Sequence, residues 1–207
     1  VYYVWYKGED SWKNPMVIDE PILGHYNSGN PDIIRQHLAW FEDLSLDFVI
    51  ISWWGENSFQ DNVTKQIFHI ASSIGTSLKL CLQVEPCEHT QKQTAVYDYV
   101  CETYTQSYSE LYFNHQGKPL LLWYHHYDMN PDFQLQQDPR FTSIITGITK
   151  ISEWCDKNFD PYHEESVPRG RHWSITPRFD ESRIPERTGY VRDVDYSEGL
   201  YMQQWEQ

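Results

Sequence analysis

The stretch Phe48-Val49-Ile50-Ile51-Ser52-Trp53-Trp54-Gly55 decides the fold. Its first four residues form a short continuous apolar run, which is typical of a strand buried on both faces of a parallel sheet. The residues that follow, Ser52 to Gly55, mark the carboxyl end of this strand. Because ligands of parallel α/β proteins bind at the carboxyl ends of the strands, the stretch predicts both a buried strand and one edge of a binding site.

Helices are predicted on both sides of this strand. Upstream, Asn30-Pro31-Asp32 offers a capping side chain, a proline at the first helical position and an acid in the first turn. Apolar residues then recur at helical spacing as far as Phe41. Downstream, a second helical stripe runs over residues 63–74, and Gly75 ends it.

The same alternation continues along the chain. An aromatic and β-branched segment predicts a first strand over Val1–Tyr6, and a helix is predicted around Val96–Tyr104. Further strands are predicted over residues 78–84, 120–124, 144–148 and 173–176, a turn over 114–119 and a last helix over 196–207. Strands and helices that alternate at these distances indicate βαβ units and a parallel sheet.

The fold class that we predict is α/β, a (β/α)8 TIM barrel that is incomplete at its C-terminal end, with residues 1–207 as a single partial barrel domain. Such a barrel typically needs about 250 residues and roughly 200 at the least. Both ends look cut, since the chain begins inside a β-prone run without Met and stops in a helix-compatible stretch. A doubly wound open sheet is the alternative, but no glycine-rich phosphate loop follows the first strand.

Composition narrows the possible partners. The chain has 30 acidic and 16 basic side chains, so its formal charge is −14, which argues against nucleic acid as a partner. No run of about 18 apolar residues predicts a membrane segment, and no targeting leader is visible. Aromatic residues make up 16 %, with 9 Trp and 15 Tyr. This content suits sugar binding, because a flat ring covers the apolar face of a pyranose while carboxylates take its hydroxyls, although aromatic rings also fill cores.

The predicted strand ends supply the candidate site residues. Three of five ends carry Trp or Tyr, a fourth carries Phe179, and three carry a carboxylate, which predicts an aromatic-walled acidic cleft for a neutral polyhydroxylated ligand. Glu85 is the strongest candidate, because a carboxylate at a barrel mouth needs a partner or a ligand. Trp53 and Trp54 should point to opposite faces, and packing under a loop is their alternative role. The full set of candidate substrate-binding residues is Tyr6, Trp53, Trp54, Glu85, Tyr124, Asp128 and Asp180.

Neither a metal nor a cofactor is expected. His125 and His126 are adjacent on a predicted strand and would point to opposite faces, and the nine histidines lack the spacing of metal ligands. The four cysteines, Cys81, Cys87, Cys101 and Cys155, form no CxxC pair and are expected to be buried or incidental thiols. No G-x-S-x-G nucleophile motif occurs.

The strand ends also resemble a known family, glycoside hydrolase family 99, the endo-α-1,2-mannosidase group. Residues 2–6, Tyr-Tyr-Val-Trp-Tyr, resemble its opening "YYxWYG", and residues 21–37 resemble its "P-x-LG-x-Y-S-S-x-DP-x-VI-x-x-H" segment, with Asn30 where Asp is usual. Residues 48–55 are similar to the strand that ends in "SWYG" or "SWWG", and Val84-Glu85-Pro86 is similar to "IEP". Residues 177–182 look like the late "PGYDDT" loop, with Arg178 in place of a glycine. The resemblance runs in order along nearly the whole chain.

This resemblance implies a (β/α)8 barrel that cleaves α-mannosidic bonds internally with retention of configuration. The family is thought to use two glutamates of a late "NEWxE" motif: one deprotonates the sugar's 2-hydroxyl, which attacks C1, and the other acts as acid and then base. That motif is absent here, so no catalytic residue is expected in this chain and the pair is expected beyond residue 207. By resemblance, Glu85 holds the substrate, while Tyr6, Trp53 and Trp54 line the glycone side.

The resemblance also suggests a Golgi, secreted or periplasmic location and an oligosaccharide or polysaccharide substrate. Two other functions remain open from the residues alone. One is a non-catalytic carbohydrate-binding barrel that keeps the aromatic rim, and the other is a barrel hydrolase that acts on another polysaccharide, such as an α-glucan or a bacterial surface polysaccharide.

Overall fold

The structure is a computed structural model, and it describes residues 1–13, 20–87, 90–126, 133–148, 179–180 and 191–192. The chain forms two compact units, Val1–Gly147 and Ile148–Gln207. In the second unit, strand β6 (Phe179–Asp180) pairs antiparallel with β7 (Val191–Arg192). The strand predicted over residues 173–176, the helix predicted over 196–207 and the candidate Asp128 lie outside the described residues.

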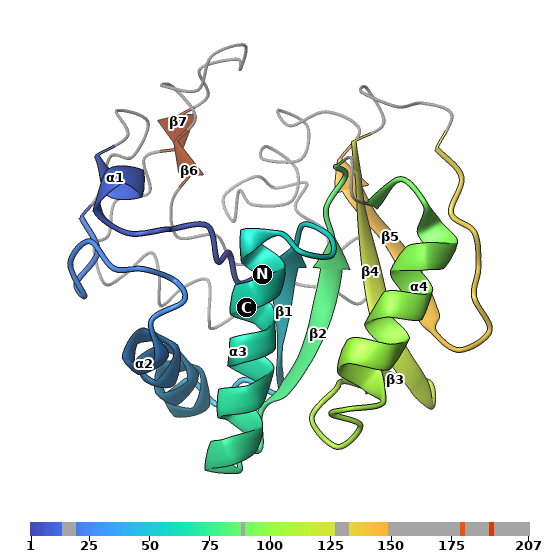
Figure 1. Cartoon of the computed structure of the whole chain (residues 1–207), viewed down its shortest axis with the longest axis horizontal. Helices are drawn as coiled ribbons and strands as arrows, with labels where there is room; N and C mark the ends of the chain where they lie inside the picture. Colours follow the sequence, from blue (N-terminus) through green and yellow to red (C-terminus); the bar gives the residue numbers. More distant parts are fainter. Residues whose placement is uncertain (14–19, 88–89, 127–132, 149–178, 181–190, 193–207) are drawn as a thin grey trace, which may run out of the picture. The chain divides into compact units, whose positions relative to one another are not determined.

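The first unit is a parallel α/β sheet with helices on one face (Figure 1). Its strands run in the order β1-β2-β4-β3, and β5 also pairs with β4. The pairs β1·β2 and β2·β4 are parallel, which confirms the α/β class. The elements are α1 (Glu9–Trp12), α2 (Pro31–Asp43), β1 (Phe48–Trp53), α3 (Phe59–Ile74), β2 (Lys79–Val84), α4 (Gln93–Val100), the π-helical turn η2 (Cys101–Thr105), β3 (Asn114–His115), β4 (Lys118–His126) and β5 (Thr142–Ile148).

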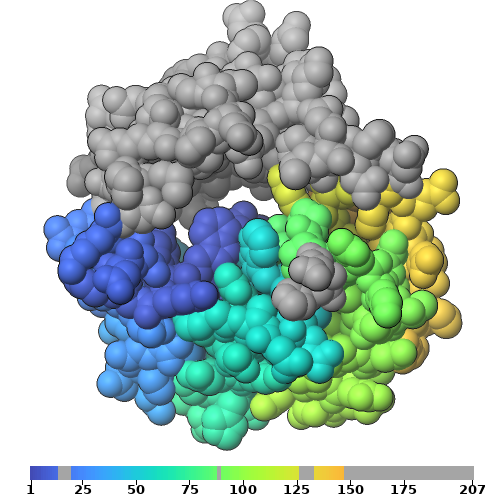
Figure 2. Space-filling view, turned by 45° about the horizontal axis from the view of Figure 1, so that its top comes forward, coloured from blue at the N-terminus to red at the C-terminus, as the bar shows by residue number. Residues whose placement is uncertain are grey.

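Local chemistry sets the ends of the two long helices where the sequence predicts them. The side chain of Asn30 accepts a hydrogen bond from the backbone N–H of Asp32 at 2.9 Å, with Pro31 at the first helical position of α2. Gly75 ends α3 in the left-handed region at φ 67°. The helices α2, α3 and α4 then follow one another in chain order across the surface (Figure 2). Among the described residues, no helix is long and apolar enough to cross a membrane.

The prediction of a first strand over Val1–Tyr6 is wrong beyond a single residue. Tyr2 alone pairs with β1: its N–H donates to the carbonyl of Ile50 at 2.6 Å, and its carbonyl accepts from the N–H of Ser52 at 3.0 Å. Further along, the N–H of Tyr6 donates to Oγ of Ser28 at 3.1 Å instead of to a neighbouring strand. Side-chain contacts therefore replace the ladder of a regular strand here.

The helix predicted around Val96–Tyr104 is divided between α4 and the π-helical turn η2. A π-helical turn widens the helix by one residue, and such turns often occur where a side chain needs an unusual direction. Here it lets Tyr99 and Tyr104, five residues apart, both reach the carboxylate of Asp61 on α3.

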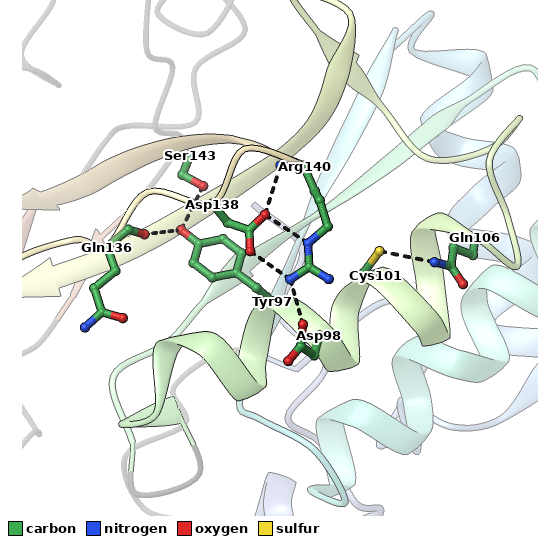
Figure 3. Close-up of polar contacts among 8 residues, drawn as sticks. All are labelled: Tyr97, Asp98, Cys101, Gln106, Gln136, Asp138, Arg140 and Ser143. Atoms are coloured by element: carbon green, nitrogen blue, oxygen red, sulfur yellow. Dashed lines mark hydrogen bonds and ion pairs between the residues drawn. The ribbon is translucent and has the colours of Figure 1, made fainter.

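Between β4 and β5, the described residues 133–141 run as an extended segment along α4 (Figure 1). Figure 3 shows how this segment is held: the hydroxyl of Tyr97 donates to the carbonyl of Gln136 at 2.8 Å, and the guanidinium of Arg140 binds Asp138 and Asp98, each at 2.7 Å. These contacts fix the approach to β5.

Candidate functional site

The register of the sheet assigns the residues of the strands to two faces. Ser52 lies beside Gln83, and Gln83 lies beside Leu122. Since side chains alternate along a strand, residues two positions further on share the same face. This face, which we call the inner face, therefore carries Ser52, Trp54, Gln83, Glu85, Leu122 and Tyr124. The opposite face packs against α4, where the ring of Trp123 lies 5.3 Å from that of Tyr97.

Glu85 is the centre of a hydrogen-bonded network on the inner face. Its side chain is only 6 % exposed, and its Oε1 accepts from Oγ of Ser52 at 2.8 Å and from Nε2 of Gln83 at 2.9 Å. No hydrogen bond from the described residues reaches Oε2. Burial raises the pKa of Glu85, while the bonds from Gln83 and Ser52 act in the opposite direction. Among the described residues, the site therefore holds a buried carboxylate whose donors both bind Oε1.

The loop after β2 fixes the backbone on which Glu85 sits. Oγ1 of Thr90 donates to the carbonyl of Glu85 at 2.8 Å and accepts from the N–H of Cys87 at 3.0 Å. The thiol of Cys87 donates to the carbonyl of Trp54 at 3.2 Å. The carboxyl ends of β1 and β2 are thus tied together, and the position of Glu85 is defined by backbone and side-chain contacts.

Aromatic rings lie beside this carboxylate. Trp54 is half-buried, and its Nε1 donates to Oγ of Ser52 at 3.2 Å, which joins the indole to the Glu85 network. Tyr124 lies on the same face of β4 and is also half-buried. Tyr3 is 44 % exposed; burial, followed by the charges of Glu85 and Tyr124, raises its pKa to about 12, so it faces the same group. Trp54, Glu85 and Tyr124 therefore lie on one face of the sheet.

Sequence reasoning missed Tyr3 and its neighbour Trp5. Their rings lie 4.5 Å apart between centroids, and both are exposed, Trp5 at 43 %. The available signal was alternation: the hydroxyl of Tyr2 binds Nδ1 of His37 on α2 at 2.7 Å, so Tyr3 is free to point away from the helices. Alternation alone does not say which side of the segment Tyr3 occupies. The pairing of Tyr2 with Ile51 of β1 fixes that side.

Trp53 corrects one prediction. It is 1 % exposed, and its Nε1 donates to Oδ1 of Asp61 at 2.9 Å. Its ring stacks near Tyr99 of α4 at 5.8 Å. Trp53 is therefore a core residue on the helix side of β1 and cannot contact a ligand at the inner face.

Tyr6 lies in a different aromatic cluster. Its ring stacks on Trp12 at 3.5 Å and lies 5.7 Å from Tyr26. It makes these contacts with α1 and the segment before α2, and among the described residues no hydrogen bond or ring contact joins it to the Glu85 network. Asp180 belongs to β6 in the second unit, and Asp128 lies outside the described residues.

The site can bind a neutral polyhydroxylated molecule. An open carboxylate oxygen accepts hydroxyl hydrogens, and exposed rings cover apolar C–H faces. Among the described residues, no group of three or more His, Cys, Asp or Glu side chains is arranged to hold a metal ion. In that network Glu85 is the one carboxylate among the described residues, so acid–base catalysis by two groups needs a further residue.

Comparison with known proteins identifies the class as a glycoside hydrolase barrel. Residues 17–137, more than half of the chain, match the model of glycosyl hydrolase family 99. The chain belongs to glycosyl hydrolase family 99, which confirms the resemblance seen in its sequence. No curated protein matches the chain in sequence.

Solved structures confirm the barrel fold. A GH99 endo-α-mannosidase from Bacteroides thetaiotaomicron in complex with BIS-TRIS-propane is similar with a TM-score of 0.69 and 20 % identity, over 99 % of this chain and 77 % of that one. A second structure of the GH99 endo-α-mannosidase from that organism gives a TM-score of 0.68 and 18 % identity, over 99 % and 78 %. At this identity the likeness concerns the fold, and it supports the predicted (β/α)8 architecture.

Proposed function

We propose that this chain forms the substrate-binding part of a glycoside hydrolase that cleaves α-mannosides internally. The observation that carries the proposal is the buried carboxylate of Glu85, whose Oε2 receives no hydrogen bond from the described residues, with aromatic rings beside it. Membership of family 99 supports a glycosidase, and the endo-α-mannosidases of similar fold support an α-mannoside as its substrate.

In this proposal, Oε2 of Glu85 accepts hydrogen bonds from sugar hydroxyls. Trp54, Tyr3 and Trp5 offer ring faces to the C–H surface of the sugar, and Tyr124 offers a further hydroxyl. Asp128 and Asp180 stay proposed hydroxyl acceptors on the grounds of sequence alone. A neutral ligand fits, since the chain carries a formal charge of −14 and would repel an anionic one.

The proposed reaction proceeds with retention through the substrate's own 2-hydroxyl. A first glutamate removes the hydroxyl proton while the oxygen attacks C1, and a second glutamate protonates the departing glycosidic oxygen. Water then opens the epoxide-like intermediate and returns the 2-hydroxyl. This differs from a carboxylate nucleophile, the usual retaining route. We propose that this pair lies beyond residue 207 and that Glu85 binds substrate without entering the reaction.

A comparison of two chain lengths tests the proposal. The 207-residue chain and a version extended by about one strand–helix unit, roughly 30 residues, would be incubated with α-1,2-mannan, α-1,3-glucan and high-mannose N-glycan. We expect the extended version to release oligosaccharides from an α-mannoside and the short chain to release none. Turnover by the short chain would show that the acids are wrongly placed. Release from glucan alone would favour another polysaccharide, and binding without any turnover would favour the carbohydrate-binding barrel.

A further inference from the structure

Gln83 lies two residues before Glu85 on β2 and has both ends of its amide engaged. It is 5 % exposed, and its Nε2 donates to Oε1 of Glu85 at 2.9 Å. Its own Oε1 accepts from Oγ1 of Thr146 on β5 at 3.3 Å. The amide thus connects the carboxylate with a strand that lies beyond β4 in the sheet.

The chemistry of these groups defines which way the amide points. An ionised carboxylate can only accept, so the NH2 group of Gln83 must face Glu85. The amide oxygen then faces Thr146, whose hydroxyl donates to it. A reversed amide would bring two acceptors together unless Glu85 carried a proton. Thr146 therefore fixes the amide, and the amide fixes Oε1 of Glu85.

We propose that Gln83 is a positioning residue for saccharide binding: together with Ser52 it holds Oε1 of Glu85, so that Oε2 is presented to a sugar hydroxyl, and Thr146 sets its orientation. This inference deepens the proposed function and rests on it. Ser52 also accepts from Nε1 of Trp54 at 3.2 Å, so the same network orients the carboxylate and the neighbouring ring together.

Among the described residues, few groups that titrate face Glu85. Ser52 reaches it from β1 and Gln83 from β2, and neither of them titrates. The charges of Glu85 and of Tyr124 on β4 both act on Tyr3 of the N-terminal segment. Tyr3 has a pKa of about 12 and stays neutral below it. The fall of ligand affinity at low pH, which we call its acid limb, therefore reports the protonation of Glu85. Because the bond from Gln83 favours the ionised form, its loss shifts that limb to higher pH.

The test compares three variants in the full 207-residue chain. Gln83→Met keeps the length of the side chain without its amide, Thr146→Val removes only the hydroxyl, and Gln66→Met makes the same chemical change on the exposed side of α3. Calorimetric titration with α-1,2-mannobiose between pH 4 and pH 8 should show about tenfold weaker binding for Gln83→Met at pH 7, as loss of a hydrogen bond to a charged group implies. We expect a smaller loss for Thr146→Val, an acid limb at higher pH for both and no change for Gln66→Met.

A second measurement needs no ligand. NMR titration of the Glu85 side-chain carboxyl should give a higher pKa in Gln83→Met, and a smaller rise in Thr146→Val, than in the unmodified chain. An unchanged pKa and an unchanged affinity profile would overturn the role of Gln83. If the unmodified chain did not bind mannobiose, the proposed function would fail, and a Glu85 pKa unaffected by Gln83→Met would overturn the positioning role separately. If Gln83→Met does not fold, Thr146→Val tests the proposal through the same two measurements, the pH profile of mannobiose affinity and the pKa of Glu85.

Discussion

Two carboxylates are buried on opposite faces of one sheet, and they are satisfied in different ways. Asp61 on α3 is fully buried and Glu85 is 6 % exposed. Both oxygens of Asp61 are saturated by donors from the helix side, namely Trp53 Nε1 at 2.9 Å, Tyr104 hydroxyl at 2.6 Å, Tyr99 hydroxyl at 2.6 Å, Lys65 Nζ at 2.8 Å and Asn57 N–H at 3.1 Å. From the part of the chain that the structure describes, Glu85 receives two donors, both on Oε1.

The pKa values of these two acids shift in opposite directions. Burial would raise the pKa of Asp61, but the bonds from Lys65, Tyr104, Tyr99 and Trp53 outweigh it and lower the pKa. For Glu85, burial outweighs its two donors and raises the pKa. A buried carboxylate that receives hydrogen bonds on both oxygens stabilises the fold. A buried carboxylate that receives them on one oxygen only is typical of a functional site.

The largest effect is expected from Asp61→Ala. The substitution leaves the hydroxyls of Tyr99 and Tyr104 and the indole N–H of Trp53 without their acceptor in the core. Breaking a buried charged network in this way costs about 3–5 kcal/mol. Urea unfolding followed by circular dichroism should show a loss of free energy of unfolding in that range. A loss below about 1 kcal/mol, the range of surface changes, would contradict the structural role of Asp61.

A much smaller change in stability is expected from Glu85→Gln. The amide keeps an oxygen that can accept from Ser52 and Gln83, and it removes a charge whose burial is unfavourable. The free energy of unfolding should stay within about 1 kcal/mol of the unmodified chain or rise. The same urea experiment measures it, and a loss as large as that of Asp61→Ala would remove the distinction between the two acids.

The pH dependence of stability should differ in sign between the two acids. Because the folded-state pKa of Asp61 is lowered, its contribution is present above the ordinary value of 3.8 and is lost as the pH falls below it. Because the folded-state pKa of Glu85 is raised, the folded state holds the proton more tightly, so stability falls as the pH rises from 4.5 through the raised pKa. Urea unfolding between pH 3 and pH 8 should therefore show Glu85→Gln gaining relative to the unmodified chain above pH 4.5. A constant difference across this range would refute the shift of Glu85.

The smallest effect is expected from Arg140→Met. Arg140 joins Asp138 and Asp98 at 2.7 Å (Figure 3), but its side chain is 43 % exposed and that of Asp98 is 62 % exposed. Exposed ion pairs contribute about 0–1 kcal/mol and are screened by salt. We expect a loss of about 0.5 kcal/mol that fades in 1 M NaCl. A larger loss, independent of salt, would mean that the segment along α4 depends on this arginine for its packing.

Much of the fold could be predicted because short-range signals define it. Asn30 and Pro31 begin α2, Gly75 ends α3, and the apolar run from Phe48 gives β1, each through local chemistry. The first strand was predicted too long, because aromatic and β-branched residues favour a strand even where long-range contacts such as that of Tyr6 with Ser28 replace the ladder.

The site could be predicted in part. Alternation indicates that Trp53 and Trp54 point to opposite faces, but in a strand buried on both faces hydrophobicity does not say which face is inner. The polar residues Ser52 and Gln83, two positions before Trp54 and Glu85, carry that signal and identify the inner face once the strands are in register. The saturation of Asp61 could not be predicted, since its donors come from segments up to 43 residues away in sequence.

Saccharide affinity measured on two matched variants tests the central claim most directly. Glu85→Gln alters the half-satisfied acid, while Tyr99→Phe removes one hydroxyl from the saturated one. Calorimetric titration with α-1,2-mannobiose should show at least about tenfold weaker binding for Glu85→Gln, as for a lost charged hydrogen-bond acceptor, and unchanged binding for Tyr99→Phe, with both variants folded. Unchanged affinity of folded Glu85→Gln would contradict the assignment of Glu85 as the acid that holds the sugar.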